Sequence, residues 1–255
     1  RAAVSGASRT VHRARLPEPE GADRLPPLMR ARVSPRRSSR VALSLAAPVL
    51  TSYDPIRQNL SQVLRPVSAD HPLGTDYLGR DMLARLLYGG RLSLLIGFFA
   101  VGIGLAVGVP LGAISGFQGG RTDLVIQRFA DILLSFPGFL LALSLVAILG
   151  VGLRNVIISV GISAVPSFIR LVRGSVLSIR EQVYVEAAHA LGQRRAVIIF
   201  RHVLPNAMAP VIVQATLSLG FAILVAAGRG FLGLGVQPPT PEWGTMLGEG
   251  RQYIF

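Results

Sequence analysis

Long apolar segments alternate with short polar ones over residues 92–227. The apolar segments cover about 92–117, 124–149, 156–177 and 207–227. A helix needs about 20 apolar residues to cross the hydrocarbon core of a bilayer, and each segment reaches that length. The pattern therefore predicts an all-α, polytopic membrane protein with four spanning helices in this part of the chain.

The first apolar segment is rich in glycine. Glycine destabilises a helix in water, but in a membrane small residues allow neighbouring helices to approach closely. We therefore expect this helix to pack tightly against others through Gly97, Gly102, Gly104, Gly108 and Gly112.

The second segment contains a proline and an acidic residue, Pro137 and Asp131. Proline lacks the N–H of the helical hydrogen bond, so we expect a kink in this span. A carboxylate is costly in lipid and normally faces protein or water. Two roles remain open for Asp131, a substrate or proton-path residue or an ion-pair partner of Arg128.

The polar and apolar pattern divides the chain into three regions. Residues 1–40 form an Arg- and Pro-rich tail that we predict to be disordered, because it has too few apolar residues to form a core. We favour a solvated cytoplasmic tail over one that binds anionic lipid or nucleic acid. Residues 41–91 combine an apolar stretch of only about ten residues, where a span needs about 20, with a polar loop. Residues 92–255 hold the transmembrane domain.

Composition excludes several classes of function. Only 15% of the residues are charged, against about 25% in soluble domains. The net charge is +13, and all 26 residues counted as Lys or Arg are arginine. Without lysine the chain cannot form a P-loop ATPase site. With no cysteine it has no disulfide and no thiolate metal site.

No nucleophile–base motif and no metal-binding motif is visible, so we expect no catalytic residue and no metal site. His189 and His202 lie in one polar segment, but no third ligand accompanies them. An intramembrane enzyme is therefore a weak alternative.

The distribution of arginine predicts the orientation in the membrane. The polar segment 178–206 carries Arg180, Arg194, Arg195 and Arg201, whereas the loop near residue 150 carries only Arg154. Short cytoplasmic loops are enriched in Lys and Arg, so we place 178–206 in the cytoplasm and the loop near residue 150 outside. Residues 51–91 hold five arginines, which conflicts with their expected position outside.

Residues 180–205 predict a helix–turn–helix on the membrane surface. Residues 180–191 favour a helix, which Gly192 can end in the left-handed conformation. A second short helix is expected over 194–203, and Pro205 would then begin the next span as a first-turn residue. The small side chains of Ala187 and Ala188 would let another protein approach closely, and Glu186 offers a charged anchor.

This segment resembles the EAA loop of ABC importer permeases. In that family the loop forms a coupling helix that docks on a cytoplasmic ATPase subunit. The family usually has isoleucine two residues before Leu-Pro, whereas this chain has His202, as is usual in the dipeptide, oligopeptide and nickel branch. The residues that match the family spacing are Glu186, Ala187, Ala188, Gly192, Leu204 and Pro205.

Two more motifs are similar to the "C" permeases of the same branch. One is HPLGTDYLGRD at residues 71–81, and the other is FLGLGVQPPTPEWG at 231–244. The chain departs from the family at 226–230, where Ala226 replaces an acidic residue and Arg229 is expected to reach the membrane surface by snorkelling. The shortened first span and the absence of a sixth span after residue 255 predict an incomplete copy.

The resemblance implies a permease subunit of an ATP-driven importer in the bacterial cytoplasmic (inner) membrane. The implied partners are a second homologous permease, two cytoplasmic ATPase subunits, an extracytoplasmic binding protein and the lipid bilayer, but no nucleic acid. ATP and Mg²⁺ would bind the ATPases, so this chain would carry no cofactor. Peptides are the favoured substrate, ahead of nickel or other small solutes. The alternatives are a degenerate fragment without transport activity and a channel or regulatory protein outside this family.

Overall fold

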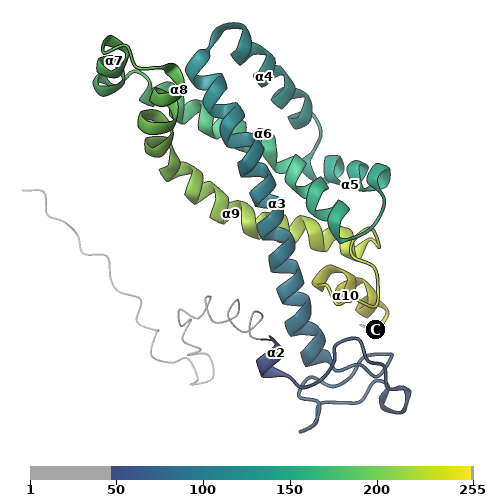
Figure 1. Cartoon of the computed structure of the whole chain (residues 1–255). Helices are drawn as coiled ribbons and strands as arrows, with labels where there is room; N and C mark the ends of the chain where they lie inside the picture. Colours follow the sequence, from purple (N-terminus) through teal and green to yellow (C-terminus); the bar gives the residue numbers. More distant parts are fainter. Residues whose placement is uncertain (1–46, 254–255) are drawn as a thin grey trace, which may run out of the picture. The chain divides into compact units, whose positions relative to one another are not determined.

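The computed structural model describes residues 47–253, and within that range the only regular structure is helical (Figure 1). The all-α prediction is confirmed. The predicted tail, 1–40, and the start of the shortened first span lie outside the described residues. The helices are α2 (Ala47–Leu50), η3 (Leu60–Gln62), α3 (Met82–Gln118), α4 (Gly120–Leu134), α5 (Gly138–Leu149), α6 (Leu153–Ile179), α7 (Val183–Ala190), α8 (Arg195–Val197), η4 (Ile198–Val203), α9 (Leu204–Phe231), α10 (Trp243–Gly250) and η5 (Arg251–Tyr253).

Three helical stretches are long and apolar enough to cross a membrane, namely α3, α6 and the continuous stretch Arg195–Phe231. The pair α4 and α5 would make a fourth span if its two halves are counted together. These elements coincide with the four predicted apolar segments. Helix α3 begins ten residues before the first of them, because Asp81 caps its N-terminus by accepting a hydrogen bond from the N–H of Ala84 at 2.7 Å.

The second predicted span is broken rather than kinked. Helices α4 and α5 meet at an angle of 86°, separated by residues 135–137. Pro137 adopts an extended backbone conformation with φ −52° and ψ 128°, and proline also disfavours the helical conformation in the residue before it. The expected bend is therefore a complete interruption of the helix.

The helix that leads into α9 is also different from the prediction. We expected a short helix that ends before Pro205, but α8, η4 and α9 form one uninterrupted helix. Its middle part, η4, is a π-helix in which the N–H of Leu204 bonds to the carbonyl of Ile199. The side chain of Asn206 donates to the carbonyl of His202 at 2.6 Å. The wider π turn accommodates a proline, which has no N–H to donate.

The core of the membrane domain is the contact between α3 and α6. Gly104, Gly108, Gly112 and Gly116 recur every fourth residue along α3 and all face α6. At Gly112, a Cβ atom would lie 2.6 Å from the carbonyl oxygen of Ile169. Such close backbone approach is what small residues permit in membrane helices.

Two of the predicted packing glycines lie on other faces of α3. Gly97 meets the side chain of Ile223 in α9, so it also serves close packing. Gly102 is exposed and has nothing within 4 Å of its Cβ position. Within the described residues Gly102 therefore takes no part in helix packing.

The first charged motif, 71–81, folds against the N-terminal end of α3. His71 is buried and joins Gln62 to Asp81, with both ring-nitrogen contacts at 2.9 Å. Arg80 donates to Asp76 at 2.6 Å. His71 therefore has a buried structural role in this loop.

Helix α10 joins the same charged cluster. Arg85 is buried and donates to Glu249 at 2.9 Å. Because Arg80 and Arg85 are neutralised by carboxylates within the fold, the arginine content of 51–91 is a poor guide to its side of the membrane. This pairing accounts for two of the five arginines, whereas Arg57, Arg65 and Arg91 remain exposed.

Candidate functional site

The predicted coupling segment lies at the C-terminal end of α3, whereas α10 lies at the opposite end (Figure 1). Two contacts hold the segment there. The ring of His189 stacks on Phe117 with centroids 5.7 Å apart, and Arg180 donates to the carbonyl of Gly116 at 3.0 Å. The 37 residues of α3 separate the two ends by about 55 Å at 1.5 Å per residue.

Helix α7 has an inner and an outer face. Val185 and Ala188 are buried, and the helix packs on η4 within the main apolar cluster. On the outer face Val183 and Leu191 are 79% and 80% exposed, with exposed Ala187 between them. These three residues are spaced four apart, so they form one apolar row along the helix.

Gly192 ends α7 in the predicted left-handed conformation, with φ +72°. Its N–H bonds to the carbonyl of His189 at 2.9 Å, and the N–H of Gln193 bonds to that of Ala188 at 3.2 Å. This pair of bonds is a Schellman motif, which satisfies the last carbonyls of the helix. The turn sends the chain back toward η4 and fixes the direction of α7.

Most of the remaining predicted site residues lie where η4 continues into α9. His202 contacts the side chain of Gln193 at 3.0 Å, so the two arms of the segment are joined. Leu204 packs against the apolar cluster, whereas Pro205 is exposed at the start of α9. Glu186 is exposed and lines a cleft of about 350 Å³ with His189.

Of the residues considered as ligands, His189 and His202 have different partners. Among residues 47–253 no group of three His, Asp or Glu side chains is arranged to hold a metal ion. The structure brings Glu186 to Pro205 into one surface segment, but not into a metal-binding arrangement.

Asp131 forms an ion pair with Arg170. One of its two predicted roles was an ion pair with Arg128, and the structure shows a different partner. The Arg170 Nη2 to Asp131 Oδ1 distance is 2.6 Å, and both side chains are about half exposed. Helix α4 packs beside α6, so an arginine of the neighbouring helix is available. Nearby, Arg173 donates twice to Asp123, at 2.6 and 2.7 Å.

Arg229 does not reach the membrane surface. It is fully buried, and it donates to Ser159 Oγ at 2.5 Å and to the carbonyl of Val225 at 3.3 Å. Its Nη2 has no partner among the described residues. The predicted snorkelling is therefore wrong, because the last turn of α9 is covered by α6 and α10.

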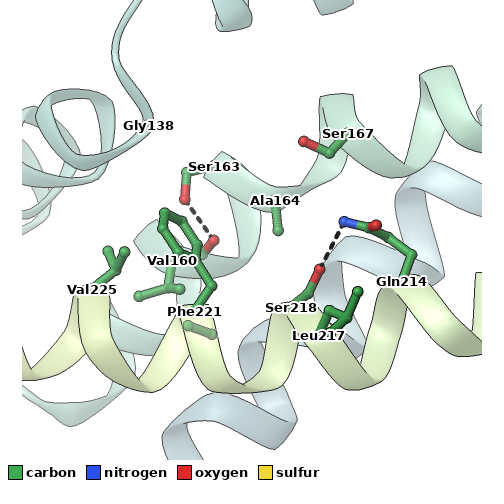
Figure 2. A pocket seen from close by; sticks show the side chains of 11 residues that line it. Gly138, Val160, Ser163, Ala164, Ser167, Gln214, Leu217, Ser218, Phe221 and Val225 are labelled. Carbon is green, nitrogen blue, oxygen red and sulfur yellow. Dashed lines mark hydrogen bonds between the residues drawn. The ribbon is translucent and has the colours of Figure 1, made fainter. Parts of the chain in front are cut away.

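A cavity of about 350 Å³ opens between α6, α9 and the start of α5 (Figure 2). Its polar lining comes from Ser163 and Ser167 of α6 and from Gln214 and Ser218 of α9. Sequence reasoning did not single out these residues. The signal that could have found them is a polar pair spaced four apart within each of two apolar segments.

Comparison with known proteins agrees with this architecture. Residues 108–255 match the model of the family described as binding-protein-dependent transport system inner membrane component. The chain is 51% identical to the dipeptide transport system permease protein of Alkalihalophilus pseudofirmus over 217 residues, which is 85% of this chain and 71% of the relative. It is 50% identical to the di/tripeptide transport system permease protein of Pseudomonas aeruginosa, covering 84% of this chain and 73% of the relative.

A solved structure gives the same fold at lower identity. The MetNI methionine ABC transporter, in an inward-facing conformation, matches 68% of this chain and 82% of its own, with a TM-score of 0.58 and 24% identity. At this level of identity the match shows a shared fold of the membrane helices. The chain is a multi-pass membrane protein and belongs to the family of binding-protein-dependent transport system inner membrane components.

Proposed function

We propose that this chain forms, with a second related permease, the translocation pathway of an ATP-driven peptide importer. Two cytoplasmic ATPase subunits would bind and hydrolyse ATP with Mg²⁺, and an extracytoplasmic binding protein would deliver the substrate. The peptide assignment is supported by the two relatives named for dipeptide and di/tripeptide transport, at 51% and 50% identity.

The observation that carries the coupling proposal is the outer face of α7. Val183 and Leu191 are among the most exposed large apolar side chains of the described residues, at 79% and 80%. An exposed apolar row at a cytoplasmic surface suits a protein partner. The small Ala187 between them lets a partner approach the helix backbone closely, while Glu186 supplies a polar contact beside the row. We assign this face to the ATPase subunit.

Coupling also requires that a force on α7 reaches the membrane helices. The stacking of His189 on Phe117 joins α7 to the end of α3. Buried Ala188 joins it to η4, which continues directly into α9. The Gly192 turn holds these contacts in register. A movement of α7 would therefore displace α3 and α9 together and change access to the pathway between the two permeases.

The test is co-purification of the ATPase subunit with this chain from membranes that contain the second permease. Leu191→Asp puts a charge on the outer face without removing a buried contact. Leu60→Asp is the matched control, because Leu60 is 72% exposed and lies in the polar segment before α3. We expect Leu191→Asp to lose the ATPase and Leu60→Asp to retain it. Equal retention by both variants would refute the docking face.

Substrate class is tested in proteoliposomes that contain the complete importer. Uptake of a labelled dipeptide should require ATP on the side of the membrane that carries the ATPase subunits and the binding protein on the opposite side. A complex that retains the ATPase but takes up no peptide would contradict the peptide assignment and leave the docking proposal intact. Flux without the ATPase would instead support a channel.

A further inference from the structure

The cavity between α5, α6 and α9 lies at the middle of the membrane helices. Ser163 and Ser167 occupy the central turns of α6, and Gln214 and Ser218 occupy the central turns of α9 (Figure 2). Polar side chains in the hydrocarbon region are costly unless they meet protein or water. Their gathering around one cavity indicates that this face does not contact lipid.

The interruption between α4 and α5 opens on the same cavity. Gly138, the first residue of α5, lines it, and the preceding residues 135–137 are exposed and non-helical. Irregular backbone at membrane depth is tolerated where it is buried in protein or lines a water-filled space. Broken helices in transporters characteristically surround the substrate route near the midplane. The break is a second observation, independent of the side chains.

The polar lining keeps hydrogen-bonding capacity for a ligand. Gln214 uses its amide nitrogen to contact Ser218 Oγ at 3.3 Å, which leaves its carbonyl oxygen without a partner among the described residues. Ser163 donates to the carbonyl of Val160 at 2.7 Å, so its oxygen can still accept. The hydroxyl of exposed Ser167 makes no hydrogen bond within residues 47–253 and is free to donate.

The lining offers only uncharged hydrogen-bonding groups. None of the eleven residues drawn around the cavity in Figure 2 is charged. A side-chain amide and several hydroxyls offer both donors and acceptors, which matches the N–H and C=O groups of a peptide backbone. Phe221 and Leu217 supply apolar contact for side chains of different kinds. A site of weak, uncharged contacts allows a substrate to enter and to leave.

We infer that this cavity is the part of the translocation pathway that contacts the substrate, and that Ser163, Ser167, Gln214 and Ser218 hydrogen-bond the backbone amides of the passing peptide. The inference rests on the proposed function, since it deepens the peptide route assigned there. The inferred site does not include Asp131, which lies on α4 and is paired with Arg170.

The test uses the absence of native cysteine, which makes every introduced thiol unique in this chain. Ser167→Cys and Ser218→Cys are nearly isosteric and line the cavity. Ile212→Cys is the matched control, because Ile212 is 59% exposed on α9 and points away from the cavity face. Each variant is reconstituted in the complete importer and treated with a small, charged, membrane-impermeant thiol reagent, with and without a dipeptide and the binding protein.

We expect both cavity variants to react at least about tenfold faster than Ile212→Cys, because only a thiolate in contact with water reacts. The peptide should slow labelling of the cavity variants and leave the control unchanged. Labelling of Ser167→Cys and Ser218→Cys no faster than that of the control would overturn the inference, as would fast labelling that the peptide does not slow.

Dipeptide uptake by the unlabelled variants distinguishes a failure of the cavity assignment from a failure of the proposed function. If the importer takes up dipeptide while the cavity positions stay unreactive, the cavity assignment fails and the proposed function stands. If the parent complex takes up no dipeptide, the proposed peptide function fails, whatever the labelling pattern. Peptide-sensitive labelling in an importing complex supports both.

Discussion

The tight contact between α3 and α6 predicts opposite outcomes for the same substitution at two positions of α3. In Gly112→Ala the new Cβ would lie 2.6 Å from the carbonyl oxygen of Ile169 and 2.8 Å from Val172 Cβ. In Gly102→Ala it would meet nothing within 4 Å. The two variants carry the same substitution in the same helix, about 15 Å apart along its axis, so their difference reports chiefly on interhelical packing.

The magnitude follows from the distances. Carbon atoms pack best about 3.5–4.0 Å apart, so α6 must move away from Gly112 by roughly 1 Å. The same movement loosens the contacts at Gly108 and Gly116, which lie on the same stripe. Overpacking of this kind costs about 1–3 kcal/mol. At Gly102 alanine removes only a weak helix former, a gain of up to about 1 kcal/mol.

The assay is thermal unfolding of the purified complex in detergent, followed by the loss of the monodisperse peak on size exclusion. A change of 1 kcal/mol shifts the melting temperature of a chain of this length by about 2–4 °C. Gly112→Ala should therefore melt about 2–12 °C below the parent, whereas Gly102→Ala should melt at or slightly above it. Identical melting temperatures for the two variants would refute the assignment of the stripe.

Two further substitutions test buried polar contacts. Asp81→Ala removes the cap of α3 and the partner of His71. It should lower the free energy of unfolding by about 0.5–2 kcal/mol and speed hydrogen exchange in the first turn of α3. Unchanged exchange would contradict the capping role. Arg229→Met removes a buried guanidinium whose Nη2 is unpaired among the described residues, while Ser159 keeps its bond to the carbonyl of Val156. Because an incompletely paired buried charge is unfavourable, the melting temperature should rise, and a fall would show that Arg229 is stabilising.

Much of the candidate site could be predicted because it depends on local sequence. A glycine after a strong helix-forming run predicts a left-handed helix end, and Gly192 has the required positive φ. The segment 180–205 could be placed at the surface because it is polar between two apolar spans. The split of α7 into an inner face at Ala188 and an outer face at Leu191 depends on where η4 returns, which the sequence of α7 does not encode.

The cavity could not be predicted because it combines distant parts of the chain. Ser163 and Gln214 are ordinary polar residues within their own segments, and each is compatible with a helix–helix contact. They acquire a shared role only when α6 and α9 lie side by side and the break before Gly138 leaves the space between them open.

By itself, the sequence determined the helical class, the apolar spans, the presence of a bend at Pro137 and the surface segment, because hydrophobic length and backbone preference act over a few turns. Only the tertiary structure decided which glycines of α3 face α6, that Asp131 pairs with Arg170, and that Arg229 is buried. The reason is that α3 is apolar around its whole circumference, so hydrophobicity alone does not mark which of its glycine-bearing faces meets α6. The partner of a charged group is likewise set by which helix packs beside it, and that choice belongs to the assembled fold.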